Sequence, residues 1–319
     1  MDGFETLTVA LAQLAPVWLD RQRTTDKVCD AISEAAARGA ALVAFGEAFL
    51  PGYPFWLERT GGAAFNSPDQ KNMYRHYLQQ AVSIADGDLT PVCRQAAQHG
   101  ISVILGTAER PVDRGGHSIY CTLVHIDARG AIPYTHRKLM PTYDERLTWA
   151  TGDGYGLRTR RLGAFTLSAL NCWENWMPLI RAALYAQGAD LHVALWPGGQ
   201  HITRDITRFV AQEGRLYALS VSGLMRPSDF PPDTPMRDLI LRDAPACLAD
   251  GGTCAAGPDG RWILEPQVGS EAIHIVTLDP ARIAEERQNF DPAGHYSRPD
   301  VARVEIDRTR QTMARFVDE

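Results

Sequence analysis

Short apolar segments alternate with longer amphipathic segments along most of the chain. Short apolar runs bounded by turn residues indicate buried strands, and apolar residues at helical spacing indicate amphipathic helices. The predicted strands are 6–15, 41–45, 102–107, 118–126, 165–170, 191–196, 218–222 and 272–278. The predicted helices are 24–37, 90–99, 177–187 and 203–217. This alternation predicts an α/β fold with a buried sheet, and no repeat or linker divides the chain.

The composition is typical of one large globular unit. The 319 residues are 45% hydrophobic, which is enough to bury a large core. The 38 acidic and 32 basic residues give a formal charge of −6, and the basic residues form no block. This charge pattern argues against nucleic acid or an anionic membrane as a partner. No apolar run approaches the roughly 18 residues of a membrane span.

The cysteines, histidines and glycines give no sign of a metal or cofactor site. None of the six cysteines forms a Cys-x-x-Cys pair, which favours free thiols in a reducing compartment. The nine histidines lack the helical spacing of metal ligands. The glycines of 152–156 have no strand before and no helix after them, so they indicate a turn. The N-terminus is acidic and has no basic n-region, so a cytoplasmic protein is expected.

Cys172 lies between a predicted strand and a predicted helix. Residues 165–170 are apolar and β-prone, and Pro178 opens a segment with apolar residues at helical spacing. A cysteine at such a junction lies on a sharp turn, where unpaired backbone N–H groups favour a thiolate and can bind an oxyanion. Most cysteines are buried and inert, so this position alone does not establish a nucleophile.

Two further segments place charged residues beside apolar ones. Glu47 follows the apolar run 41–45 and is surrounded in sequence by aromatic residues, which would raise its pKa toward that of a general base. The alternative is a strand-end acid that points into water. Lys138 and Glu145 flank a short turn that contains proline. A single lysine of this kind is more often a solvated surface charge.

Together these three segments resemble the nitrilase superfamily, whose members use Glu, Lys and Cys in that chain order. Glu47, Lys138 and Cys172 match the three motifs residue by residue, and Glu145 matches a fourth carboxylate found in many members. The resemblance extends from about residue 6 to about residue 301. It implies a four-layer α-β-β-α sandwich, with one domain over 1–301 and a C-terminal tail over 302–319.

The residues around two of the motifs also indicate a branch of this superfamily. Trp-Glu-Asn follows Cys172, and Lys138 lies in the run Arg-Lys-Leu-Met-Pro-Thr. Both contexts are similar to true nitrilases, whereas amidases and carbamoylases more often carry Tyr-Asp after the nucleophile. The resemblance therefore implies hydrolysis of a nitrile to a carboxylic acid and ammonia.

The resemblance implies a role for each matched residue. Cys172 would attack the nitrile carbon and form a thioimidate, then an acyl-enzyme, while Glu47 accepts the thiol proton and activates water. Lys138 would stabilise the tetrahedral intermediates together with a backbone N–H near Trp173. Glu145 would hold Lys138 or the attacking water in place.

The expected partners are a small nitrile, water and other copies of the chain. Tyr53, Trp173 and Trp196 are the predicted pocket residues, and aromatic residues near the motifs favour an aromatic or arylaliphatic nitrile. In the resembled family, the helices that follow Cys172 and span 203–217 pack against symmetry mates. A self-complementary contact there predicts a homodimer or a higher homo-oligomer.

Several alternatives stay open at this point. An amidase or another carbon–nitrogen hydrolase would use the same triad, and hydration of a nitrile could stop at the amide. A silent scaffold on the same fold is disfavoured, because a scaffold does not need three buried reactive side chains. A papain-like Cys/His enzyme is disfavoured because the flanking signature of that family is absent.

Overall fold

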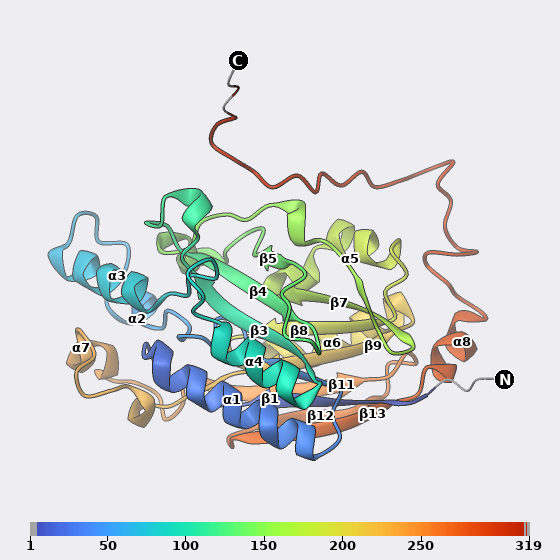
Figure 1. Cartoon of the computed structure of the whole chain (residues 1–319), viewed down its shortest axis with the longest axis horizontal. Helices are drawn as coiled ribbons and strands as arrows, with labels where there is room; N and C mark the ends of the chain where they lie inside the picture. Colours follow the sequence, from blue (N-terminus) through green and yellow to red (C-terminus); the bar gives the residue numbers. More distant parts are fainter. Residues whose placement is uncertain (1–4, 316, 318–319) are drawn as a thin grey trace.

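The computed structural model describes residues 5–315 and 317, and it contains two β-sheets packed face to face between helices (Figure 1). The first sheet has the order β13-β1-β2-β3-β4-β5, and the second has the order β10-β11-β9-β8-β7-β6 with β12 paired to β11. The α-β-β-α sandwich that the resemblance implied is therefore confirmed, as is the α/β class that the apolar pattern predicted.

The strands divide between the two sheets, and their numbers follow chain order. The strands of the first sheet are β1 Leu7–Gln13, β2 Leu42–Phe45, β3 Ser102–Glu109, β4 Tyr120–Ile126, β5 Thr135–Arg137 and β13 Ala272–Leu278. Those of the second sheet are β6 Arg160–Leu162, β7 Phe165–Asn171, β8 Leu191–Trp196, β9 Tyr217–Ser222, β10 Leu224–Met225, β11 Ala249–Ala256 and β12 Trp262–Val268. The helices are α1 Arg21–Ala37, α2 Trp56–Arg59, α3 Pro68–Gln80, α4 Thr90–His99, α5 Pro178–Tyr185, α6 Gln200–Gly214, α7 Arg237–Leu241 and α8 Ala281–Arg287.

Both faces of the central strands are buried, which explains why their sequences are apolar throughout. On β1, Val9 and Leu11 face the second sheet and join a cluster that contains Leu167 and Val193. The alternate residues of β1 face the opposite way, into a cluster formed with α1 and α4. A strand with one face on another sheet and one face on helices has no exposed side, so the alternation of polar and apolar residues disappears.

Every strand and helix predicted from the sequence is present, with ends that differ by a few residues. The elements that the sequence did not predict are β5, β6, β10, β11, β12, α2, α3 and α7, whereas the mixed charges of 284–288 indicate the end of a helix, as found in α8. Most of these are short. Helix α3 is long but mainly polar, because only Met73 and Tyr77 of its residues are buried. Strand β11 contains Gly251 and Gly252 and pairs irregularly with β12, which removes the usual signal of a strand.

After α8 the described residues form an extended segment that crosses the molecule (Figure 1). Ile306 packs against the small cluster of Leu157, Leu170 and Leu184, and Arg310 forms an ion pair of 3.1 Å with Asp153. The segment is therefore anchored near its end. The boundary at residue 301 stays a prediction, while β13 joins the C-terminal part of the chain to β1 in one sheet.

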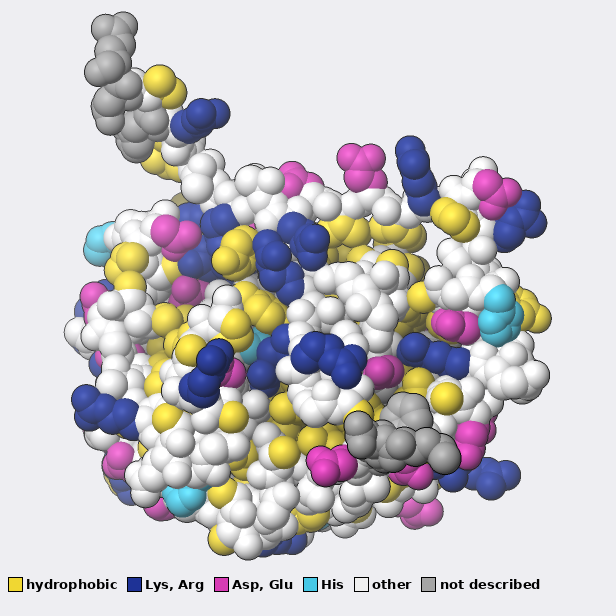
Figure 2. All heavy atoms as spheres, turned by 45° about the vertical axis from the view of Figure 1, so that its right-hand side comes forward, with side chains coloured by type: hydrophobic (Ala, Val, Ile, Leu, Met, Phe, Trp, Pro, Cys, Tyr) yellow, Lys and Arg dark blue, Asp and Glu magenta, His cyan; other side chains and the backbone are white. Residues whose placement is uncertain are grey.

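Acidic and basic side chains are interspersed on the face shown in Figure 2. Among residues 5–315 and 317, no helix combines the length and apolar character that crossing a membrane requires.

At Gly106, β3 lies close to the backbone of residues 46–48, which follow β2. A Cβ atom at this position would lie 2.2 Å from the carbonyl oxygen of Gly46 and 2.7 Å from the backbone nitrogen of Ala48. Because both contacts are with backbone, Gly106→Ala is expected to lower the free energy of unfolding by about 1–3 kcal/mol or more. Urea denaturation measures this value.

Gly257→Ala is the matched control for that substitution. Its added Cβ would meet a side-chain oxygen of Asp259 at 3.1 Å and no backbone atom at a shorter distance. Equal stability of the two variants would contradict the close approach of β3 to Gly46.

Candidate active site

The three segments singled out in the sequence converge beyond the C-terminal ends of three strands. Glu47 follows β2, Lys138 follows β5 and Cys172 follows β7, so two of these residues come from the first sheet and one from the second. Each segment contains a residue with left-handed backbone: φ is 46° at Ala48, 43° at Tyr143 and 44° at Cys172. Such conformations cost about 1–3 kcal/mol each and concentrate at functional sites.

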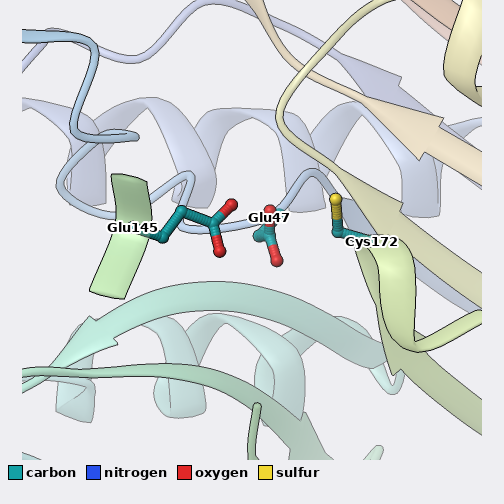
Figure 3. Close-up of side chains that lie close together, drawn as sticks. All are labelled: Glu47, Glu145 and Cys172. Carbon is teal, nitrogen blue, oxygen red and sulfur yellow. The ribbon is translucent and has the colours of Figure 1, made fainter. Parts of the chain in front are cut away.

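The ammonium of Lys138 lies between two carboxylates. Its Nζ is 2.7 Å from Oε1 of Glu47 and 2.7 Å from Oε2 of Glu145, and all three side chains are almost completely buried. Oxygen atoms of both glutamates and the sulfur of Cys172 lie within 4.8 Å of one another. Figure 3 shows the Glu47 carboxylate between Glu145 and Cys172. The structure thus brings all four predicted residues together.

Glu145 is held by contacts beyond the lysine. The hydroxyl of Tyr53 donates to its Oε1 at 2.9 Å, and the backbone N–H of Thr142 donates to its Oε2 at 2.6 Å. The ring of Trp149 packs beside the ammonium, with 5.5 Å from Nζ of Lys138 to the ring centroid. These contacts fix the carboxylate that in turn fixes Lys138.

Cys121 on β4 is a residue that the sequence reading missed. Its thiol lies 3.5 Å from Oε1 of Glu47, and its backbone carbonyl accepts the N–H of Lys138 at 2.8 Å. The only sequence signal is its place on the strand paired with the Lys138 segment, which becomes informative once the register of β4 and β5 is known.

Burial controls the protonation of this cluster. It raises the pKa of Glu47 to about 7, against the opposing effect of Lys138. Burial alone would lower the pKa of Lys138, but Glu47 and the other nearby acidic groups raise it well above its usual range. Lys138 is therefore a permanent cation, whereas Glu47 changes charge near neutral pH.

The thiol of Cys172 is neutral at rest, which differs from the expectation that the turn would favour a thiolate. Burial, followed by the charge of Glu47, raises the pKa of Cys172 well above its usual range. Lys138 and the backbone N–H of Trp173 act in the opposite direction and are outweighed. A nearby base must therefore take the proton before the sulfur can attack. Within the described residues, Oε2 of Glu47 has no hydrogen-bond partner, so it is available for this proton.

A chain of buried polar groups supports the turn at Cys172. The amide of Asn175 donates to the carbonyl of Cys172 at 2.7 Å, and its oxygen lies 2.7 Å from Nε2 of His192. Nδ1 of His192 in turn lies 2.8 Å from the hydroxyl of Ser168. These bonds tie the left-handed residue to β7 and β8, which compensates for its strain.

A cavity of about 260 Å³ leads to the cluster. Cys172, Glu145 and two of the predicted pocket residues, Tyr53 and Trp173, line it. The structure does not bring Trp196 to the cavity: its side chain is completely buried, and its indole N–H donates to Ser220 at 3.0 Å.

Trp196 contacts the site through its backbone instead. Its carbonyl accepts the N–H of Glu47 at 3.1 Å, which joins the end of β8 to the segment after β2. Sequence alone could not separate these roles, because the direction of a side chain at a strand end depends on register.

The carboxylates and the thiol are close enough to hold a metal ion in principle. However, Nζ of Lys138 already lies at hydrogen-bond distance from an oxygen of each carboxylate. An added cation at this position would have to displace the ammonium or tolerate its repulsion. The donor set therefore fits a protonated lysine better than a resident metal.

Comparison with known proteins agrees with this geometry. The carbon-nitrogen hydrolase family model matches residues 8–288. An aliphatic nitrilase of Sinorhizobium fredii (strain HH103) is 34% identical over 304 residues, which cover 93% of this chain and 94% of the relative. An arylacetonitrilase of Aspergillus niger is 34% identical over 324 residues, which cover 99% of this chain and 93% of the relative.

The fold is also similar to that of solved structures. A carbon-nitrogen hydrolase from Helicobacter pylori G27 superposes with a TM-score of 0.71 at 17% identity, covering 93% of this chain and 97% of that chain. The family match extends over most of the chain, and the nitrilase relatives align over nearly all of it. The chain therefore belongs to the carbon-nitrogen hydrolase family, in its nitrilase branch.

Proposed function

We propose that this enzyme hydrolyses a nitrile to the carboxylic acid and ammonia through a covalent intermediate on Cys172. The observation that carries the proposal is the buried Lys138 ammonium, which lies 2.7 Å from Glu47 and 2.7 Å from Glu145 beside the Cys172 thiol. A nitrile carbon is a weak electrophile without a leaving group, so its attack needs a strong nucleophile and a proton for the nitrogen. The thiol and the paired Glu47 provide both.

In the first half-reaction, Glu47 takes the proton of the Cys172 thiol and the sulfur attacks the nitrile carbon. The C≡N bond becomes C=N as the C–S bond forms, and the nitrogen receives the proton to give a thioimidate. Water activated by Glu47 adds to this carbon, and the C–N bond of the tetrahedral intermediate breaks to release ammonia. The product of this half-reaction is a thioester.

In the second half-reaction, another water attacks the thioester, and the C–S bond breaks to release the carboxylic acid and restore the thiol. Lys138 stabilises the negative charge of the intermediates, with the backbone N–H of Trp173 close to the sulfur. Glu145 keeps the ammonium in place through its own bonds to Tyr53 and Thr142. The reaction consumes two water molecules for each nitrile.

The lining of the cavity supports an uncharged substrate with an apolar, aromatic body. Tyr53, Phe55, Trp173 and Leu248 provide apolar surface, while Glu58 and Asp144 place acidic groups at the same cavity. None of the described lining residues is Lys or Arg, and the Lys138 ammonium below them is already paired with two carboxylates, so the cavity offers a negatively charged substrate no unpaired Lys or Arg. The relatives include one named an aliphatic nitrilase and one named an arylacetonitrilase, so the aromatic preference remains our proposal.

Self-association is the second part of the proposal. Trp173, Trp176, Leu179 and Phe209 are large apolar residues that are 48%, 41%, 63% and 45% exposed, and they lie on α5, α6 and the turn at Cys172. The rings of Trp176 and Phe209 are stacked with centroids 6.4 Å apart. A two-fold contact between two such surfaces would bury them and would lie next to the turn that carries the nucleophile.

Cys172→Ala is expected to abolish turnover, with loss of activity below detection, because Cys172 is the cysteine that lines the cavity, whereas the Cys121 thiol is completely buried beside Glu47. Ammonia release is measured with matched nitriles and amides, each aromatic, arylaliphatic and aliphatic, for the wild type and the variant. Aromatic nitriles are expected to be the best substrates. Circular dichroism serves as the control for folding. Substantial activity in the variant would exclude Cys172 as nucleophile, and turnover of amides alone would identify an amidase.

The acid limb of the pH profile is expected to report Glu47. Because the reaction needs its carboxylate form and its pKa is about 7, kcat/KM should fall about tenfold per pH unit below that value. The charge of Glu145 raises the pKa of Glu47, so Glu145→Gln should move the acid limb to lower pH even though it also lowers the maximal rate. Asp113→Asn is the control, since it changes a carboxylate paired with Arg137 instead. If the acid limb of kcat/KM has the same midpoint pH in Glu145→Gln as in the wild type, its assignment to Glu47 is wrong.

The proposed contact predicts a dimer or larger assembly in solution. Leu179→Glu and Phe209→Glu should each produce monomers with reduced activity, because a carboxylate cannot be buried in an apolar contact without a large cost. Size-exclusion chromatography with light scattering measures the mass. Val112→Glu, at an apolar residue 57% exposed on another part of the surface, is the control. A wild-type monomer with full activity would refute the proposal.

A further inference from the structure

The carboxylate of Glu174 is a completely buried charge that the reaction above does not use. Its two oxygens lie 3.0 and 3.1 Å from Nε2 of His136 on β5. The backbone N–H of Leu139 donates to Oε1 at 2.6 Å, and the backbone N–H of Asn171 donates to Oε2 at 3.0 Å. One side chain therefore collects three donors from two separate segments.

These donors flank the two groups on which the chemistry depends. Leu139 directly follows Lys138, and Asn171 directly precedes Cys172. The first of these segments leaves the edge strand of one sheet, and the second ends a strand of the other sheet. No backbone pairing between β5 and β7 joins them, because each strand belongs to a different sheet. The Glu174 carboxylate spans that boundary.

We infer that Glu174 is a positioning residue that sets the location of the Lys138 ammonium relative to the Cys172 sulfur, acting through its bonds to Leu139, Asn171 and His136. This inference rests on the proposed roles of Lys138 and Cys172. A carboxylate with two backbone N–H donors and one imidazole donor has little freedom to move. The carboxylate therefore fixes the distance between the segment that contains Lys138 and the segment that contains Cys172.

The electrostatics of the pair agree with this arrangement. Burial alone would raise the pKa of Glu174, but His136 and the two backbone donors lower it below its usual range. The side chain is thus an anion, and as an anion it can accept from both segments at once. A glutamine at this position keeps the shape, but its NH₂ group cannot accept, so one of the two backbone bonds must be lost.

The test is Glu174→Gln, followed by the rate at which iodoacetamide alkylates Cys172. The rate is measured by mass spectrometry of the peptide that contains this residue, with Cys172→Ala as the blank. A displaced Lys138 stabilises the thiolate less, so alkylation is expected to slow by at least about tenfold. The kcat for nitrile should fall by a similar factor, with KM changed much less. Glu174→Asp should lower the alkylation rate and kcat in the same way, because its shorter side chain cannot reach both segments. This second variant allows the test even if Glu174→Gln does not fold.

Asp190→Asn is the matched control. Asp190 also accepts a backbone N–H of β7, that of Thr166 at 2.6 Å, but at the end of the strand opposite to Cys172. This variant is expected to lose stability while the alkylation rate of its folded molecules stays at the wild-type value. If Glu174 only stabilised the fold, its variants would also lose stability and keep the wild-type alkylation rate. A wild-type alkylation rate in both folded Glu174 variants would therefore overturn the inference.

The outcomes separate this inference from the proposed function. Slower alkylation in the Glu174 variants supports the positioning role even if the wild type hydrolyses no nitrile, a result that would overturn only the substrate. Conversely, nitrile hydrolysis by the wild type together with unchanged alkylation and kcat in the variants would overturn only the role of Glu174.

Discussion

The ion triplet of Glu47, Lys138 and Glu145 is the interaction on which the site depends. Burying an ammonium is costly unless it is paired, and here each side of Lys138 has a carboxylate at 2.7 Å. The surroundings then supply the remaining partners of Glu145, from Tyr53 and Thr142. A fixed cation beside a carboxylate whose pKa is about 7 gives the enzyme both a permanent positive charge and a base that titrates near neutrality.

The sandwich architecture explains why this triplet lies beside a cysteine. Glu47 and Lys138 come from the first sheet, whereas Cys172 comes from the second, so the reacting groups meet only because the sheets pack face to face. Apolar side chains such as Leu11 and Val193 hold that packing over a wide area. Individual hydrogen bonds between the sheets then fix the site, such as the one from the backbone N–H of Glu47 to the carbonyl of Trp196. Stability of the core and geometry of the site are therefore linked.

The same junction connects the nucleophile to the surface. Asn175 holds the carbonyl of Cys172, and its own carbonyl accepts from Arg181 of α5 at 2.8 Å. Arg181 is paired with Glu213 of α6 at hydrogen-bond distance. The surface of α5 and α6 that is proposed to self-associate is thus only a few bonds from the strained residue. Hydrogen bonds through Asn175 and Arg181 therefore connect these two helices to the turn at Cys172.

The sequence by itself determined the fold class, the long strands and helices, and the candidates Glu47, Lys138, Cys172 and Glu145, because periodicity and short motifs are local properties of the chain. It did not determine the short edge elements, whose formation depends on neighbouring strands rather than on their own residues. It placed Trp196 in the pocket, whereas register turns the indole into the core. Only the tertiary structure decided that Cys121 reaches Glu47 and that Glu174 joins two sheets, because these contacts link segments that are distant along the chain.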